Sequence, residues 1–251
     1  MIELILFFAG FFGGIMNALA GGGSGLTFTA LIFAGLPPVA ANATNTFAAT
    51  IGYITGAIGY REYIWAARDK LIWQVPVSIV GGFLGGWVLL NIDERMFSTS
   101  VPWLLLFATL LFWWAPRLTA SARHAAFAKH GAVAAACLFL VCIYGGYFQA
   151  GFGILTLGAL ALTGYTNLAQ MNGLKLIFAA VSSTAAIVLF IAADTILWTA
   201  GISVMIGIAL GSYVAARVAT RIPDRPLRMI ISLISIGVTV YFFWDVYGAK
   251  G

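Results

Sequence analysis

Two glycine-rich stretches, GGIMNALAGGGSG at residues 13–25 and GGYFQAGFG at residues 145–153, decide how this chain folds. Each interrupts an apolar run, and each is followed by a second, short apolar run, at 25–36 and 154–164. At about 1.5 Å per helical residue such a run covers roughly 17–18 Å, too little to cross a hydrocarbon core of about 30 Å. The pattern predicts helices that break inside a membrane and either turn back as re-entrant hairpins or cross as tilted pairs.

The composition indicates that lipid, not water, surrounds most of this chain. Of its 251 residues 62% are hydrophobic and 8% are charged, and its mean hydropathy is +1.00. Soluble domains carry about 25% charged residues. Because apolar runs fill almost the whole length, we expect an all-α, multi-pass membrane protein without a separate soluble domain.

The net charge of +5 does not indicate a nucleic-acid partner, because the cations are concentrated in three short segments. These segments hold ten of the thirteen Lys and Arg residues: Arg61, Arg68, Lys70, Arg117, Arg123, Lys129, Arg217, Arg221, Arg225 and Arg228. Short basic segments between apolar runs are typical of cytoplasmic loops. Residues 1–20 end like a signal peptide, but their apolar stretch has no Lys or Arg before it. A similar segment recurs at 131–150, so we expect a retained membrane segment.

The chain contains an internal repeat. Gly23 and Gly25 recur 128 residues later as Gly151 and Gly153, and the small-residue run 81–86 corresponds to 207–212. Each half has an apolar segment, a glycine-rich break, a short apolar run and three long apolar runs. We therefore divide the chain into two transmembrane repeats, residues 1–122 and 123–251.

Equivalent loops of the two halves carry opposite charge. The basic loop 61–70 corresponds to Ala-Ala-Asp at 192–194, and Asp-Glu-Arg at 93–95 corresponds to the basic segment 217–228. With basic loops inside, the halves lie upside down relative to each other and both termini face outward. Inverted repeats are typical of secondary transporters, with the site at the repeat interface near the midplane. The number of full crossings, between six and ten, stays open.

The glycine breaks predict an anion site. A helix that starts just after a break directs its free N–H groups and the positive end of its dipole at whatever lies there. The residues expected to line such a site are Gly23, Ser24, Gly25, Gly151 and Gly153. The alternative is that these glycines only permit close helix packing.

Lys175 is the one Lys or Arg embedded in an apolar run, and it lies about 12 Å into a helix expected to start near Asn167. An intramembrane lysine indicates a functional site, and no acidic residue occupies a comparable depth. The alternative is that its long side chain snorkels to the cytoplasmic interface.

Neutral amide and hydroxyl groups near the breaks are further candidates for binding an oxyanion. They are Asn17, Asn42, Thr44, Asn45, Gln149 and Asn172. Each could instead cap or bridge helices. The sequence has no nucleophile–base pair, metal-ligand spacing or ATP phosphate motif, so we expect neither an enzyme nor a cofactor. An anion channel and a membrane-embedded enzyme or assembly subunit are the rival classes.

Several motifs resemble those of the TauE/SafE family of sulfite exporters. In the first half these are residues 21–25, Gly-Leu-Pro-Pro at 35–38 and Ala-Asn-Ala-Thr-Asn at 41–45. The second half matches through residues 145–153, 169–175 and 211–217. The resemblance implies transport of sulfite, thiosulfate or an organosulfonate across the bacterial inner membrane. It leaves open the exact substrate, the direction (export, or import of thiosulfate or another sulfur oxyanion), the coupling ion and whether the protein is a homo-oligomer.

Overall fold

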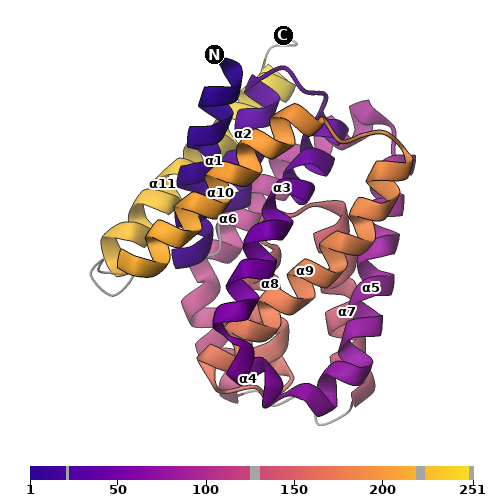
Figure 1. The fold of residues 1–251 in the computed structure, drawn as a ribbon, viewed down its shortest axis with the longest axis vertical. Coiled ribbons are helices and arrows are strands. Elements are labelled where there is room, and N and C mark those ends of the chain that lie inside the picture. Colours follow the sequence, from indigo (N-terminus) through magenta and orange to yellow (C-terminus); the bar gives the residue numbers. More distant parts are fainter. Residues whose placement is uncertain (21–22, 125–130, 219–223, 249–251) are drawn as a thin grey trace.

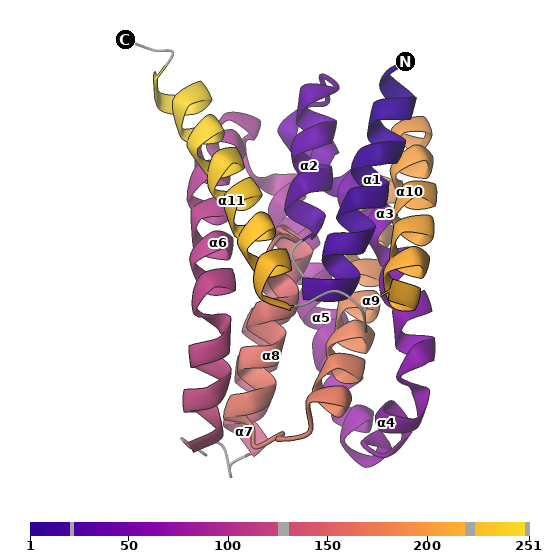
Figure 2. The ribbon, with the colours of Figure 1, turned by 90° about the vertical axis from the view of Figure 1, so that its left-hand side faces the viewer.

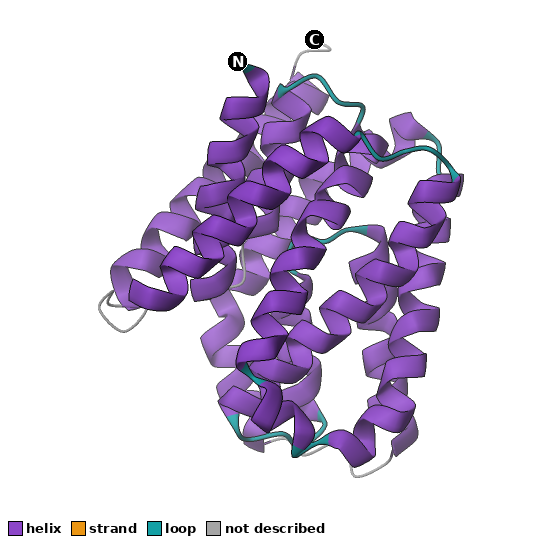
Figure 3. Cartoon of the chain, in the orientation of Figure 1, coloured by secondary structure: helices purple, strands orange, loops and turns teal. Residues whose placement is uncertain are grey.

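The computed structural model describes residues 1–20, 23–124, 131–218 and 224–248, and these residues form helices and no strand (Figure 3). The helices pack side by side, and both chain termini lie at one end of the molecule (Figures 1 and 2). We name this end the terminal end. The opposite end, which carries the short helix α4 (Arg61–Trp65) within the basic segment 61–70, is the basic end.

Two helical hairpins enter the bundle from opposite ends. Helix α1 (Ile2–Ala20) runs inward from the terminal end, and α2 (Gly23–Phe33) returns to it. Helix α7 (Gly131–Tyr147) rises from the basic end, and α8 (Phe152–Leu162) returns there. Each pair returns the chain to the end from which it started, as both arrangements that the sequence left open require.

Longer helices surround the hairpins. They are α3 (Pro38–Gly59), α5 (Arg68–Asn91), α6 (Glu94–His124), α9 (Leu168–Ala192), α10 (Trp198–Val218) and α11 (Asp224–Phe243), which continues as the π-helical turn Trp244–Gly248. Within the described residues α5, α9 and the Trp198–Ala215 part of α10 are long and apolar enough to cross a membrane. The hairpin helices are apolar but shorter.

Both short helices end in the same kind of turn. Gly35 and Gly164 each adopt a φ of 88°, a left-handed conformation that glycine adopts without strain. Behind them the N–H groups of Leu36 and Tyr165 reach back to the carbonyl oxygens of Leu31 and Leu160, at 3.2 and 3.1 Å. This six-to-one hydrogen bond is that of a Schellman motif.

Glycines allow the closest helix contacts of the bundle. A Cβ on Gly14 would overlap the carbonyl oxygen of Ile208, so α1 and α10 touch through their backbones. A Cβ on Gly85 would overlap the carbonyl oxygen of Ile143, so α5 and α7 touch in the same way. Small residues are common at such interfaces in membranes because helices gain there from close van der Waals packing.

Large apolar side chains cover the outside of the bundle, with Trp87, Trp113 and Leu140 among the exposed ones. The carboxylates that the structure describes are exposed as well: Glu3, Glu62, Asp69, Asp93, Glu94, Asp194 and Asp245. A soluble monomer does not expose so much apolar surface. The surface therefore fits a multi-pass membrane protein.

Candidate functional site

The tips of the two hairpins meet inside the bundle. Ser24, in the first turn of α2, donates a hydrogen bond of 3.3 Å to the carbonyl oxygen of Gln149, in the break between α7 and α8. A Cβ on Gly25 would lie 3.9 Å from the Cβ of Ala150. The structure thus brings together the two glycine breaks through residues that are 125 positions apart in sequence.

Asn45 on α3 fixes the first break. Its Nδ2 donates to the carbonyl oxygen of Ser24 at 3.1 Å, and its Oδ1 accepts from the hydroxyl of Thr27 at 2.5 Å. All three side chains are buried. Because both ends of the Asn45 amide are bonded to α2, this residue positions the start of that helix and does not face a cavity.

The second break is held by Gln149 and Tyr144. The Gln149 Nε2 bonds to the hydroxyl of Ser183 on α9, and the Tyr144 hydroxyl donates to the carbonyl oxygen of Ala150 at 2.6 Å. The Oε1 atom of Gln149 is buried without a hydrogen-bond partner among the described residues. Because this atom is an acceptor, a water or another hydrogen-bond donor is needed to complete it.

A cavity of about 530 Å³ extends from the basic end toward the breaks. Its walls come from the last turns of α1, α3 and α10 and from the first turns of α9, and Asn172, Lys175 and Ser212 are among its polar residues. Thr55 and Gly59 also line it and are exposed, so it opens where α3 approaches the basic segment.

The inner end of this cavity narrows to a constriction beside the breaks. The space there is about 20 Å³, room for about one water. Its lining residues are Asn17, Ser24, Tyr53, Gln149, Phe152, Gly153, Lys175, Leu176 and Ala179. Asn17, Lys175 and Leu176 line both the constriction and the wider cavity.

Lys175 supplies the positive charge of the site. Its side chain is half-buried, and its Nζ donates to the Oδ1 of Asn172 one turn earlier, at 3.2 Å. Neither the cavity nor the constriction is lined by a carboxylate from the described part of the chain. The ammonium therefore faces the cavity with a neutral hydrogen-bond partner and no counter-charge.

Tyr53 and the backbone of Gly153 provide donors that the protein leaves unused. The Tyr53 side chain is 6% exposed and lines the constriction, and its hydroxyl has no hydrogen-bond partner in the described residues. The Gly153 N–H, in the first turn of α8, likewise has none there. Together with Lys175 these groups can bind an oxyanion. Tyr53 was not predicted from the sequence; the available signal was that it is the one tyrosine of a helix rich in small residues.

Other predicted site residues lie elsewhere. The Asn42 Nδ2 donates to the carbonyl oxygen of Tyr147 at 2.9 Å, and the Thr44 hydroxyl accepts from the N–H of Leu197 at 3.0 Å, just before α10 begins. Both therefore bridge helices, one of the two roles that the sequence left open. Gly23 packs against the backbone of α1, where a Cβ would overlap the Gly13 carbonyl oxygen.

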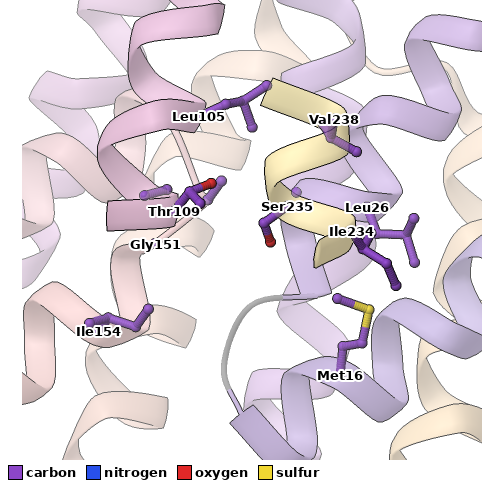
Figure 4. Close-up of a pocket in the computed structure, with 12 residues that line it drawn as sticks. Met16, Leu26, Leu105, Thr109, Gly151, Ile154, Ile234, Ser235 and Val238 are labelled. Carbon is purple, nitrogen blue, oxygen red and sulfur yellow. The ribbon is translucent and has the colours of Figure 1, made fainter. Parts of the chain in front are cut away.

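Gly25 and Gly151 line a separate cavity of about 30 Å³ between the breaks and helices α6 and α11 (Figure 4). Its labelled side chains are mostly apolar, among them Met16 and Ile154. Gly151 has a φ of 83°, which suits the sharp start of α8. Of the predicted glycines, only Gly153 lines the constriction.

Toward the terminal end the constriction is closed by packed aromatic rings. The ring of Phe28 on α2 contacts those of Phe148 and Phe242, with centroids 5.5 and 6.0 Å apart. The ring of Phe97 packs on Phe148 at 6.4 Å. All four side chains are buried. The cavity therefore opens at the basic end, and buried rings pack on the terminal side of the breaks.

Among the described residues, no group of three or more His, Cys, Asp and Glu side chains is arranged to hold a metal ion.

Several of the basic residues singled out in the sequence cannot be placed. Two of them, 129 and 221, lie outside the described residues, and the structure does not describe the side chains of 117, 123, 217, 225 and 228.

Comparison with known proteins gives one consistent result. The family model "Sulfite exporter TauE/SafE" matches residues 6–242. A "Probable membrane transporter protein" of Haemophilus influenzae is 28% identical over 246 residues, covering 96% of this chain and 94% of the relative. The "Probable membrane transporter protein YfcA" of Escherichia coli K12 is 26% identical over 251 residues, covering 98% and 91%. No solved structure matches.

Proposed function

Because this chain belongs to the sulfite exporter TauE/SafE family, we propose that it is a secondary transporter that exports a small sulfur-containing anion, sulfite or an organosulfonate, by alternating access. The relatives named as probable membrane transporters support transport in general. The observation that carries the proposal is the unpaired ammonium of Lys175 at the inner end of an open cavity, beside two helix breaks.

The proposed binding site combines one charge with neutral donors. The Lys175 ammonium balances the charge of the anion, while the Tyr53 hydroxyl and the Gly153 N–H donate to its oxygens. Asn17 and Ser24 line the same space. Helix α8 begins at this point and directs the positive end of its dipole inward, which also favours an anion.

The proposed motion is a rocking of two inverted repeats, residues 1–122 and 123–251, about the site. The packing supports a twofold relation between the halves, because α1 packs on α10 of the other half and α7 packs on α5 in the equivalent way. The hairpins of the two halves also enter from opposite ends (Figure 2). The conformation described here is open to the basic end, which we assign to the cytoplasm.

Export follows from this orientation and from the membrane potential. With basic segments inside, both termini of the protein lie outside the bacterial inner membrane. The cavity would then collect its anion from the cytoplasm. A potential of about 100 mV, negative inside, favours outward movement of each net negative charge by about 2.3 kcal/mol.

An anion channel is the rival function. The narrowing to about 20 Å³ and the buried rings of Phe28, Phe148 and Phe242 favour a carrier, because an open pore needs a continuous path. Saturation and counterflow of the transported anion separate the two.

The test is efflux of radiolabelled sulfite from proteoliposomes under an imposed inside-negative potential, with native protein and Lys175→Gln. We expect saturable, potential-sensitive efflux from the native protein and its loss in the variant. Native efflux no faster than from empty liposomes would redirect the proposal to another sulfur anion. Full efflux in Lys175→Gln would contradict the role of the lysine and favour snorkelling.

A further inference from the structure

In the empty carrier, the charge of Lys175 has no acidic partner among the described residues. Each carboxylate that the structure describes is exposed, and the ion pair found among these residues, Arg68 with Asp69 at 3.8 Å, lies at the basic end. The Lys175 Nζ has the neutral Asn172 Oδ1 as its partner. An anion in the site would therefore supply the counter-charge that the surrounding helices lack.

Alternating access requires this site to close on both sides during each half-cycle. The groups that would then enclose the ammonium are mostly small or apolar: Phe152, Gly153, Leu176 and Ala179 contribute to the constriction. Tyr53 on α3, Asn17 on α1 and Ser24 on α2 are neutral donors or acceptors. An unpaired lysine in the middle of a membrane is strongly unfavourable, by a factor of about 100 on insertion scales.

We infer that the empty carrier returns slowly and that the protein works as an anion exchanger, in which a second small anion fills the site on the return half-cycle. With a singly charged anion such as hydrogen sulfite bound, the closed site is neutral and can reorient in either direction. Without one, closure buries an unpaired charge. The inference rests on the proposed function. It also limits the role of the membrane potential, which then acts on the difference in charge between the two anions.

The experiment compares two external solutions. Radiolabelled sulfite leaves proteoliposomes into medium with either unlabelled sulfite or gluconate, at zero potential held by valinomycin and equal K⁺. We expect efflux to be at least about tenfold faster with external sulfite, since an unpaired lysine in the closed site is disfavoured by a factor of about 100 on insertion scales. Chloride and sulfate, tested in the same way, identify which small anions serve as the counter-substrate.

Asn172→Asp tests the cause. The substitution is isosteric and places a carboxylate where an oxygen already accepts from Lys175, so the empty site becomes neutral. We expect its efflux into gluconate to rise relative to efflux into sulfite, so that the ratio falls toward one, together with a higher KM for sulfite. Asn167→Asp is the matched control. Asn167 is exposed and caps the same helix by accepting from the Gln170 N–H at 3.1 Å, and aspartate caps equally well, so this variant should keep the native ratio.

The outcomes separate this inference from the proposed function. No sulfite flux into any medium would contradict the proposed function itself. Equal native efflux into sulfite and gluconate, well above empty liposomes, would leave a transporter but overturn exchange. A native ratio that persists unchanged in an active Asn172→Asp protein would overturn the charge explanation. If that variant carries no sulfite at all, the native ratio alone decides.

Discussion

The side chains at the inner constriction differ in how far the protein already satisfies them. Gln149 and Ser24 are bonded to neighbouring helices and hold the two breaks together. Lys175 is bonded to a neutral group on its own helix. Tyr53 has a hydroxyl without a partner in the described residues. The donors that the protein leaves unused, the Tyr53 hydroxyl and the remaining N–H groups of the Lys175 ammonium, can bind an anion without first breaking an internal bond.

Tyr53→Phe tests this distinction at a single atom. The variant keeps the ring packed against the bundle and removes the hydroxyl. Because one neutral hydrogen bond contributes about 0.5–1.5 kcal/mol, we expect the KM for sulfite to rise roughly threefold to tenfold with little change in thermal stability. Saturation curves of efflux measure KM, and Tyr63→Phe, at an exposed position of α4, is the control. An unchanged KM would remove Tyr53 from the site.

Residue types and spacing indicate a candidate for the charge of the site more clearly than they indicate its neutral donors. Lys175 could be found because a cation within an apolar run is visible in the sequence alone. Thr44 and Asn42 could not be separated from cavity-lining residues, because their partners, Leu197 and Tyr147, come from distant segments. Whether a polar side chain faces a cavity or another helix depends on tertiary packing, which sequence spacing does not record.

At the scale of helices, the repeat predicted more of the arrangement. Both glycine breaks coincide with hairpin tips, and the runs 81–86 and 207–212, which correspond in sequence, lie where α5 meets α7 and α10 meets α1. The sequence could not show which glycines are in close contact. Gly85 touches the backbone of α7, whereas a Cβ on Gly158 of α8 would meet nothing within 4 Å.

This difference predicts opposite effects of the same substitution. Gly85→Ala forces α5 and α7 apart, and we expect a loss of about 1–3 kcal/mol. Gly158→Ala adds a methyl group in open space within a helix and should be neutral or stabilising, by up to about 1 kcal/mol. Thermal unfolding of the purified protein in detergent measures both. Gly211→Ala, at the α1–α10 contact, should resemble Gly85→Ala, and equal losses at Gly85 and Gly158 would contradict the packing argument.

At the scale of the whole molecule, the cavity and the charges point to the same side. The cavity opens near Gly59, at the helix end that precedes the basic segment 61–70, and the rings around Phe148 shut the opposite side. If basic segments face the cytoplasm, the anion enters from the cell interior in this conformation. The sequence alone predicted the orientation of the loops but not which side of the site is open, because that depends on the conformation.

Single cysteines can measure this orientation. In a background with Cys137 and Cys142 replaced by alanine, Thr55→Cys places a thiol on the cavity wall, and Asn91→Cys places one at the exposed end of α5, on the opposite side. We expect a membrane-impermeant, charged thiol reagent to label Asn91→Cys in intact cells and Thr55→Cys only in inside-out vesicles. Added sulfite should slow labelling of Thr55→Cys alone, because the anion occupies the cavity. Labelling of Thr55→Cys from outside and of Asn91→Cys from inside would invert the orientation, and the export direction argued from it would fail with it.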